Sequence, residues 1–262
     1  MKIQYCSDLH LEFQENEAFV KSNPLLPVGD ILILAGDIVP FAQMDKHPDF
    51  FNYLADHFEV TYWIPGNHEY YYSDASERSG SLNESIRNNI FLLNNQSIKI
   101  NNTKLIFSTL WSSISQANGR MIQKNMSDFN VMSYLGQPFS TDNFNQLHQE
   151  SKSFLISALQ EKEDCLTVVV THHVPTLFNY PVKYKDSLLN EAFVVELYDL
   201  IEDSGIDYWI YGHTHVNTPD FQVGKTHLLT NQLGYIIYNE HQYFEIDKTI
   251  HFHEKSPAGA DL

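Results

Sequence analysis

Apolar residues in this chain gather in short runs that are separated by longer polar segments. Eight runs of strand length are rich in β-branched and aromatic residues: KIQYC, DILILA, VTYWI, KLIFSTL, CLTVVV, DYWIY, THLLT and YIIYN. Runs of this length and composition predict β-strands. Between them, apolar positions recur with helical spacing and predict four helices, over residues 49–57, 75–88, 143–160 and 188–203.

The order of these segments predicts the fold class. Strands and helices alternate over the first two thirds of the chain, which favours a mainly parallel sheet. After residue 215 the strand runs follow one another through turns, and NNQSIKINNTKLIF indicates a β-hairpin around Asn101 and Asn102. We therefore expect an α/β protein with two mixed sheets packed together and flanked by helices, a four-layer α/β/β/α sandwich.

One segment has no clear period. Residues 111–137 are rich in Ser, Asn, Gln and Met and match neither the helical nor the strand pattern. No internal repeat or low-complexity linker divides the chain, and 262 residues with 43% hydrophobic composition suffice for one core. We expect a single domain over residues 1–262, in which 111–137 forms a loop or cap over the functional site.

Composition narrows the class of partner. The chain has 16 basic and 33 acidic residues, a formal net charge of −17 and no basic run, which argues against extended nucleic acid or anionic lipid as a partner. It has no signal-peptide pattern and no apolar run of the roughly 18–20 residues that span a bilayer, so we expect a cytoplasmic protein. Cys6 and Cys165 lie in apolar runs without a Cys-x-x-Cys spacing and are expected to be buried free thiols.

Five polar clusters directly follow apolar runs: SDLH, GD, GNHE, THH and GHTH. Ligands bind beyond the carboxyl ends of strands in open α/β sheets, so these clusters can meet in one crevice. Extended backbone sends positions i and i+2 to the same side, which would place Asp8 beside His10 and His213 beside His215. The imidazole, carboxylate and amide donors suit Zn, Mn or Fe, and the absence of cysteine among them argues against a closed structural zinc site.

Taken in this order, the five clusters resemble the motifs of the calcineurin-like metallophosphoesterase superfamily. Further segments, TLWSS, MSDF, YKDSLLNEAF and LGY, look like parts of a bacterial subgroup of that superfamily. The resemblance implies a metallophosphoesterase-type fold with a centre of two divalent transition metal ions, Mn, Zn or Fe. It assigns one ion to Asp8, His10 and His215, assigns the other to Asn67, His172 and His213, and places Asp37 between them.

The resemblance also implies a mechanism. A carboxylate can hold two cations about 3.5–4 Å apart, and such a pair lowers the pKa of a trapped water toward neutrality. We expect a phosphoric ester hydrolase in which a metal-bound hydroxide attacks phosphorus, Asp37 bridges the ions, and His68 protonates the leaving oxygen or positions the ester. Two ions (+4), Asp8 and Asp37 (−2) and a bridging hydroxide leave a charge of roughly +1, which attracts phosphate.

Some neighbouring residues have no settled role. The family pattern favours His172 over the adjacent His173 as the ligand. The run Tyr70 to Tyr72 could line the site, although aromatic runs more often pack. Lys183 and Lys185 lie between two motifs and could reach a phosphate, although loop lysines are usually solvated.

The chain also departs from the family pattern in two places. GDIVPF lacks the second Asp that related chains often have, and NQLGY has Gln232 and Leu233 where related chains often show Pro and Arg. The expected substrate is therefore only a small phosphorylated metabolite or nucleotide, either a monoester or a diester. A non-catalytic scaffold of the same fold and a nuclease are the alternatives, disfavoured by the complete set of ligands and by the acidic balance respectively.

Overall fold

Two six-stranded sheets form the centre of the computed structural model, which describes residues 1–161, 163–250 and 252. The first sheet has the order β14-β1-β2-β3-β5-β4, with β1 Ile3–Cys6, β2 Ile31–Ala35, β3 Val60–Ile64, β4 Leu82–Arg87, β5 Ile90–Asn94 and β14 Thr249–Ile250. The second has the order β12-β13-β11-β10-β7-β6, with β6 Gln96–Ile100, β7 Thr103–Ser108, β10 Leu166–Thr171, β11 Tyr208–Ile210, β12 Phe221–Val223 and β13 Thr226–Leu229. In each sheet four central strands are parallel and both edge strands are antiparallel.

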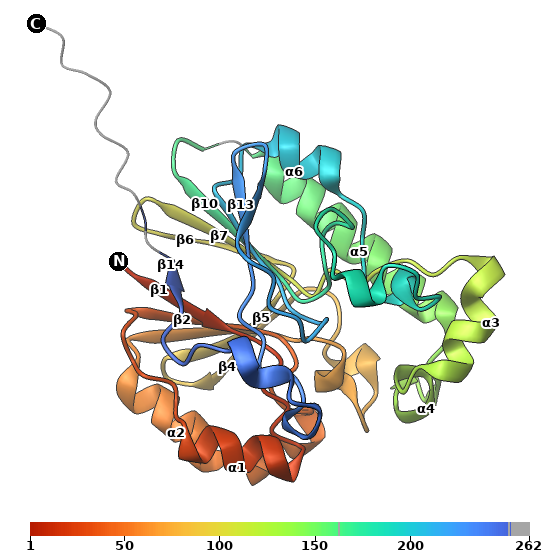
Figure 1. Ribbon diagram of the computed structural model, residues 1–262, viewed down its shortest axis with the longest axis horizontal. Coiled ribbons are helices and arrows are strands. Elements are labelled where there is room, and N and C mark those ends of the chain that lie inside the picture. Colours follow the sequence, from red (N-terminus) through yellow and green to blue (C-terminus); the bar gives the residue numbers. More distant parts are fainter. Residues whose placement is uncertain (162, 251, 253–262) are drawn as a thin grey trace, which may run out of the picture.

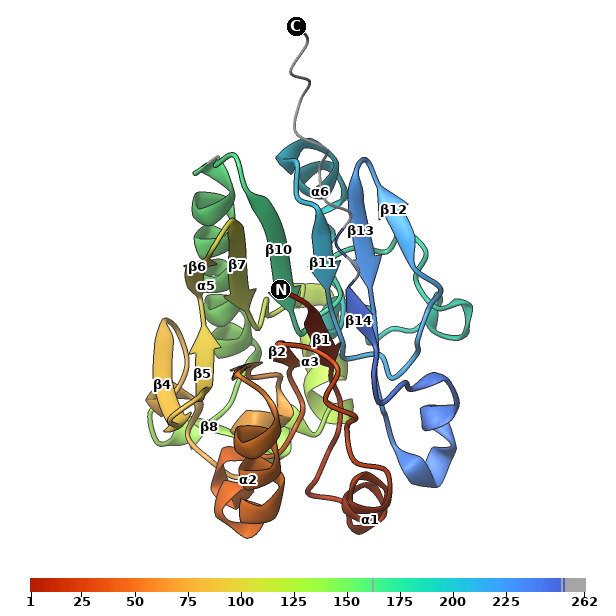
Figure 2. The same ribbon diagram turned by 90° about the vertical axis from the view of Figure 1, so that its left-hand side faces the viewer.

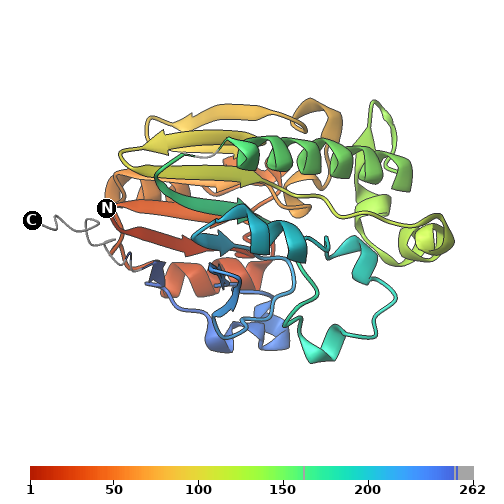
Figure 3. The same ribbon diagram turned by 90° about the horizontal axis from the view of Figure 1, so that it is seen from above.

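Helices cover the outer face of each sheet. Helices α1 (Gln14–Ser22) and α2 (Pro48–His57) lie against the first sheet, while α5 (Thr141–Gln160) and α6 (Tyr198–Ser204) lie against the second (Figures 1 and 2). Seen from above, α5 runs along the second sheet over much of the length of its strands (Figure 3). The predicted α/β sandwich of two mixed sheets flanked by helices is therefore confirmed.

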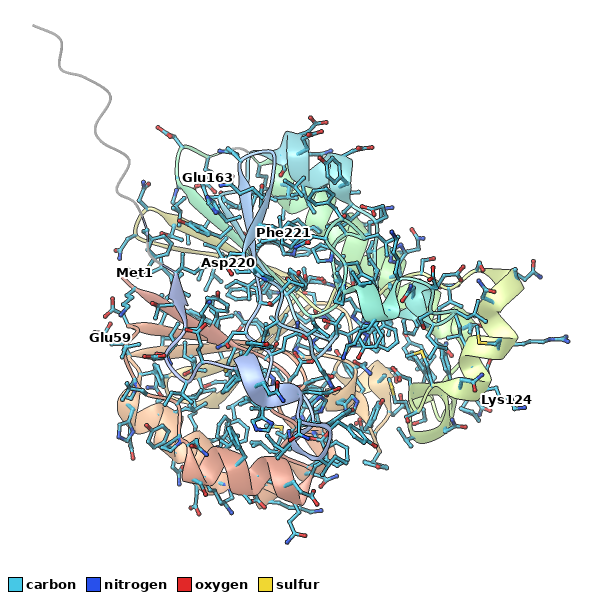
Figure 4. All side chains as sticks on the ribbon, viewed as in Figure 1. Met1, Glu59, Lys124, Glu163, Asp220 and Phe221 are labelled. Atoms are coloured by element: carbon cyan, nitrogen blue, oxygen red, sulfur yellow. The ribbon has the colours of Figure 1, made fainter. Side chains whose placement is uncertain are left out.

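Alternate residues of the central strands fill the space between the sheets. Ile33 and Ile64 of the first sheet pack in one cluster with Phe107 and Val168 of the second. Side chains fill this space along its length (Figure 4). Both faces of these parallel strands are buried, which explains why their sequences are continuous apolar runs rather than alternating ones.

The apolar runs predicted the central strands correctly, but three other predictions were wrong. Residues 75–88 form a short 3₁₀ turn and then strand β4, whose side chains alternate between half-buried and exposed with period two. Residues 188–203 contain a 3₁₀ turn and only the short α6, which ends at Gly205 in the left-handed conformation. The YIIYN run forms a 3₁₀ turn over Ile236–Tyr238 that leaves Tyr238 68% exposed, and not a strand.

The segment without a period contains regular structure. It forms α3 (Gln116–Asn125), α4 (Asp128–Val131) and, with the next residue, a small hairpin of β8 (Ser133–Tyr134) and β9 (Gln137–Pro138). Trp111 at its start is buried in an aromatic cluster with Phe144 of α5. Among the described residues, no helix is both long and apolar enough to cross a membrane.

Candidate metal centre

The polar clusters lie beyond the carboxyl ends of central strands in both sheets. Asp8 follows β1, Asp37 follows β2 and Asn67 follows β3, while His172 follows β10 and His213 follows β11. The strands β1 and β2 run toward the side of the molecule that carries α3 (Figure 1). In Figure 4 Glu59, just before β3, and Lys124, in α3, mark the two opposite sides. The clusters of both sheets therefore meet on the side of α3, as expected for an α/β site.

The backbone at these residues is not extended, so the geometric reason given for the His-x-His pair is wrong. Left-handed φ angles occur at Asp8 (57°), His10 (48°), Asp37 (55°), His213 (77°) and His215 (54°). Outside glycine this conformation costs about 1–2 kcal/mol per residue. It persists only where surrounding structure enforces it, which is typical of functional sites.

Backbone hydrogen bonds between neighbouring loops hold this strained arrangement. The Asp8 N–H donates to the Gly36 carbonyl and the His10 N–H to the Asp37 carbonyl, both at 2.9 Å. The Asp8 carboxylate accepts the N–H of His213 from the other sheet at 3.0 Å. The two sheets are thus joined directly at the site.

Glycine is required where the motif loops approach one another. A Cβ at Gly36 or Gly66 would overlap the imidazole of His172, and one at Gly212 would overlap the Asp8 carboxylate. Only a residue without a side chain fits these positions. The Gly in GD, GNHE and GHTH therefore has a steric function in bringing donors together.

The first group of donors contains Asp8, His10, Asp37 and His215, whose candidate atoms lie within 4.8 Å of one another. The Nδ1 atoms of His10 and His215 bond the carboxylates of Glu12 (3.2 Å) and Glu240 (2.7 Å). Since a carboxylate accepts and Nδ1 donates, each neutral ring carries its lone pair on Nε2. These two Nε2 atoms lie 2.9 Å apart, and a cation bound by both lone pairs would remove their repulsion.

The second group contains Asp37, His172 and His213. His172 Nδ1 bonds the Ala35 carbonyl at 2.9 Å, so that Nε2 points into the site, 3.1 Å from His213 Nδ1 and 3.3 Å from Asp37 Oδ2. The same Asp37 oxygen lies 3.8 Å from His10 Nε2 of the first group. Asp37 therefore lies between the two groups.

Two buried atoms at this group have no hydrogen-bond partner among the described residues, His213 Nε2 and Asn67 Oδ1. The Asn67 amide nitrogen donates to Asp128 Oδ1 at 3.1 Å, which fixes the amide with its oxygen away from that carboxylate. A buried polar atom without a partner is costly, and a metal ion would remove that cost. The donors present therefore fit divalent transition metal ions.

His68 lies outside these two groups, but with His10 and Glu12 it forms a third group of candidate donors, in which it pairs with Glu12. Its Nδ1 is 2.8 Å from Glu12 Oε1, its ring stacks on Tyr71 with centroids 4.0 Å apart, and its Nε2 is 3.5 Å from the Tyr235 hydroxyl. Burial lowers the pKa of His68, but the charges of Asp37 and Glu12 outweigh burial and raise it to about 9. Burial raises the pKa of Glu12, but its bonds to both imidazoles lower it to about 2.

Glu69, the last residue of GNHE, supports the loops from beneath. One oxygen accepts the Ile38 N–H and the Trp63 indole N–H, and the other accepts the N–H groups of Asp37 and Gly66. Burial raises the pKa of this carboxyl group, and the donated hydrogen bonds oppose the rise. Glu69 fixes the loops that follow β2 and β3 relative to each other.

Four carboxylates without a predicted role support predicted ligands: Glu12, Glu69, Asp128 and Glu240. Glu12 and Glu69 lie within or two residues beyond a motif, so their position was a usable signal. Asp128 and Glu240 lie far along the chain from the residues they bond, and no pattern in one sequence predicts such pairs.

The structure also shows where His173, Gln232 and Leu233 lie relative to the donor groups. His173 is buried, and its ring packs on Trp111 and lies 4.3 Å from the ring of His213. Gln232 accepts the His215 N–H at 2.7 Å, whereas Leu233 is fully buried in the core under α1. The departure from the family pattern therefore leaves no cationic side chain at this position, and Gln232 instead supports the backbone of His215.

The tyrosine run divides between packing and exposure. Tyr70 is fully buried, Tyr71 stacks on His68, and Tyr72 is 63% exposed. Lys183 lies 4.5 Å over the ring of Tyr184 and does not line the pocket at the site, and neither does Lys185. Both cysteines are buried and free, as predicted.

A pocket of about 650 Å³ opens above the two donor groups. Its base includes Asp37, Asn67, His68, His213 and His215. Its walls come from the tyrosine run, from residues 125–128 between α3 and α4, from the loop 180–193, and from the turn 235–240. This volume is typical of a small-molecule site.

Comparisons with known proteins agree with this site. The family model for calcineurin-like phosphoesterase matches residues 1–217. An uncharacterized protein of Acanthamoeba polyphaga mimivirus is 32% identical, with 95% of this chain and 98% of that protein aligned. The fold is similar to that of phosphopantetheinyl hydrolase from Mycobacterium tuberculosis, with a TM-score of 0.70, 16% identity and 98% of both chains covered. The chain therefore belongs to the calcineurin-like phosphoesterase family and is a metal-dependent phosphoesterase.

Proposed function

We propose that the chain hydrolyses a small phosphoric ester at a centre of two divalent transition metal ions, Mn, Zn or Fe. The observation that carries this proposal is the pair of Nε2 lone pairs facing each other at 2.9 Å in the first donor group. The second group, with its unpartnered Asn67 and His213 atoms, supports a second ion. The residues that would hold the ions are Asp8, His10 and His215 on one side, Asn67, His172 and His213 on the other, and Asp37 between them.

Bound there, the ions would supply an activated water at neutral pH and would stabilise negative charge on the phosphoryl oxygens. The remaining steps belong to the side chains. Glu12 holds His68 through Nδ1, so Nε2 faces the pocket, where it can donate a proton to the leaving oxygen or hold the ester. Tyr235 lies beside this nitrogen and limits where the leaving group can stand.

We also propose that the chain forms one domain in which residues 111–137 cover the site. Met126 and Asp128 line the pocket, and Asp128 bonds the amide of Asn67. The segment therefore contributes to both substrate access and ligand orientation. The phosphopantetheinyl group named for the Mycobacterium tuberculosis neighbour is one candidate substrate to include in a panel.

The proposal is tested by measuring metal content and hydrolysis together. Protein loaded with Mn, Zn or Fe is assayed for ions per chain and for hydrolysis of aryl phosphates, mononucleotides, cyclic nucleotides and a phosphopantetheinyl ester. We expect about two ions per chain and turnover that is lost on chelation. Folded protein that binds no metal and hydrolyses nothing would favour the non-catalytic scaffold.

The role of His68 is tested with matched histidine deletions. His68→Ala should lower turnover by about 10²–10⁴-fold and spare metal content, because the ring belongs to neither of the two groups that contain Asp37. His57→Ala removes an exposed histidine of α2 and should change neither quantity. Full activity in His68→Ala would remove this residue from the mechanism.

A further inference from the structure

The pocket above the donor groups is unusually acidic for a phosphate site. Glu12, Asp37, Asp128 and Glu240 line it, and none of the described residues that line it is Lys or Arg. Lys183 lies close enough for its charge to act on Glu240, but its side chain extends over the Tyr184 ring outside the lining. The His68 imidazole is paired with Glu12, so no unpaired cationic side chain in the described lining offsets the second charge of a phosphate dianion.

The supporting carboxylates change the charge of the centre. A count with Asp8, Asp37, two divalent ions and one hydroxide gives about +1. Glu12, Asp128 and Glu240 each bond a predicted ligand and add three negative charges, which gives about −2. Even a protonated His68 leaves the total negative. Such a centre favours the least anionic phosphate that can still contact the ions.

Aromatic side chains dominate the outer wall, and some of them are unpacked. Phe13, Tyr72 and Tyr238 line the pocket and are 40%, 63% and 68% exposed. Tyr72 also has a left-handed backbone (φ 62°), which is rare for a bulky residue, and its N–H bonds the Val131 carbonyl at 2.9 Å. Strain at an exposed ring that core packing does not explain points to a contact with a ligand.

We propose, on the basis of the function proposed above, that the physiological substrate is a phosphodiester monoanion bearing a flat aromatic or heteroaromatic group. The low charge of the diester suits the acidic centre, and its ring lies against the exposed rings of Tyr72 and Tyr238. Phosphomonoesters and polyphosphates are poor substrates because each carries at least one further negative charge. Extended nucleic acid is a poor substrate for the same reason, because it carries a negative charge at every phosphate.

Three substrates with the same leaving group separate the effect of the phosphate charge from the effect of the aromatic ring. They are p-nitrophenyl phosphate, ethyl p-nitrophenyl phosphate and thymidine 5′-(p-nitrophenyl phosphate). At pH 7.5 with metal-loaded protein, kcat/KM should rise at least about tenfold from the monoester to the ethyl diester. It should rise about tenfold again with the thymidine ring, the effect expected for one stacked base. A monoester that is hydrolysed faster than both diesters would overturn the inference and leave the phosphoesterase proposal intact. No hydrolysis of any of the three would overturn both.

The effect of charge on substrate preference is tested by adding a cationic side chain to the pocket lining. Asn125, at the end of α3, lines the pocket and bonds no predicted ligand. Asn125→Lys should raise kcat/KM for the monoester relative to the ethyl diester by about five- to tenfold, whereas the uncharged Asn125→Met should leave the ratio unchanged. If Asn125→Lys leaves the ratio of the two kcat/KM values unchanged, the pocket charge does not set the preference for diesters.

The contribution of the exposed tyrosine rings to substrate binding is tested by removing them one at a time. Tyr72→Leu and Tyr238→Leu should each reduce the advantage of the thymidine diester over the ethyl diester by about five- to tenfold. Tyr243→Leu is the control, because Tyr243 is 74% exposed but does not line the pocket. Equal effects in all three variants would overturn the stacking site.

Binding without turnover gives an independent measurement. Metal-free protein is titrated by calorimetry with thymidine 5′-monophosphate, a dianion, and with its methyl ester, a monoanion with a poor leaving group. The methyl ester should bind at least about fivefold more tightly, because all the carboxylates are then uncompensated. Tighter binding of the dianion would overturn the preference for diesters.

Discussion

The floor and the rim of the pocket are built in different ways. The floor consists of the donors at the strand ends, from Asp8 to His215. Most of them are buried, five have a left-handed backbone, and Asp8 is bonded to His213 of the other sheet. The rim consists of residue 72, residues 125–131, residues 180–190 and residues 235–238, which lie in turns and short helices. The floor therefore sets the chemistry that the family shares, and the rim is free to set the substrate.

The two regions should respond differently to mutation. A change in the floor removes support from several residues at once, since each carboxylate there accepts more than one hydrogen bond. A change in the rim affects one contact with substrate or one loop. The following predictions, from the largest expected effect to the smallest, test this division.

The largest effect is expected at Asp37, which lies between both donor groups. Asp37→Asn removes a charge from both donor groups and should lower kcat by about 10³-fold or more, since metal assistance supplies several kcal/mol. Metal analysis should show fewer than two ions per chain. The exposed Asp45→Asn should have no effect, and full metal occupancy with normal kcat in Asp37→Asn would place the centre elsewhere.

Replacement of the Glu69 carboxyl group by an amide should affect stability more than chemistry. Its carboxylate accepts four N–H groups, and Glu69→Gln places an amide NH₂ against donors. We expect a loss of about 3 kcal/mol in the free energy of unfolding, measured by urea titration. Glu77→Gln, an exposed neighbour, should cost less than about 0.5 kcal/mol. Equal stability of the two variants would contradict the supporting role.

Glu12 should have an intermediate effect on activity. Glu12→Gln leaves the amide unable to accept strongly from both His10 and His68, which should reduce turnover or metal affinity by about 10–100-fold. The exposed Glu15→Gln is the matched control. If turnover falls while metal content stays constant, Glu12 acts mainly through His68, and if metal content falls as well, it also acts through His10. If neither turnover nor metal content changes, Glu12 has no role at the site.

The smallest effect is expected at Asp74, which lies next to the rim, two residues after Tyr72. Asp74 accepts hydrogen bonds from Ser76 and from the N–H groups of Leu135 and Gly136, which lower its pKa to about 2. A depressed carboxyl pKa stabilises the folded state above the unfolded value of about 4, and this contribution is lost as the pH falls toward 2. Asp74 is partly exposed to solvent, so Asp74→Asn should cost less than about 1 kcal/mol at pH 7.

Urea titrations of both proteins between pH 7 and pH 2 measure this difference. The two unfolding free energies should converge as the pH falls, and metal content should not change. A difference that is constant with pH would mean that the Asp74 charge does not hold the β8–β9 hairpin.

Sequence predicted the floor better than the rim for a physical reason. Parallel strands buried on both faces are continuous apolar runs, and their carboxyl ends carry the donors, so Asp8, Asp37 and Asn67 could be located from short-range pattern alone. Helix α1 was not predicted from the sequence. Only two of its residues, Asn16 and Val20, are buried, so its apolar residues show little periodicity.

Other features depend on contacts between distant parts of the chain. The supporting bonds from Asp128 to Asn67 and from Glu240 to His215 join residues 61 and 25 positions apart. Edge strand β4 was mistaken for a helix because its apolar residues are few and only half-buried. Tertiary packing decides such positions, and local propensity does not.

The division of the donors between the two sheets has a consequence for biosynthesis. Asp8, His10, Asp37 and Asn67 follow strands of the first sheet, whereas His172, His213 and His215 follow strands of the second. A nascent chain on the ribosome presents the early carboxylates long before the last imidazoles emerge. If residues from both sets hold the metal, we expect stable retention of cations to wait until translation has passed residue 215, which would make metal loading a late, nearly post-translational event.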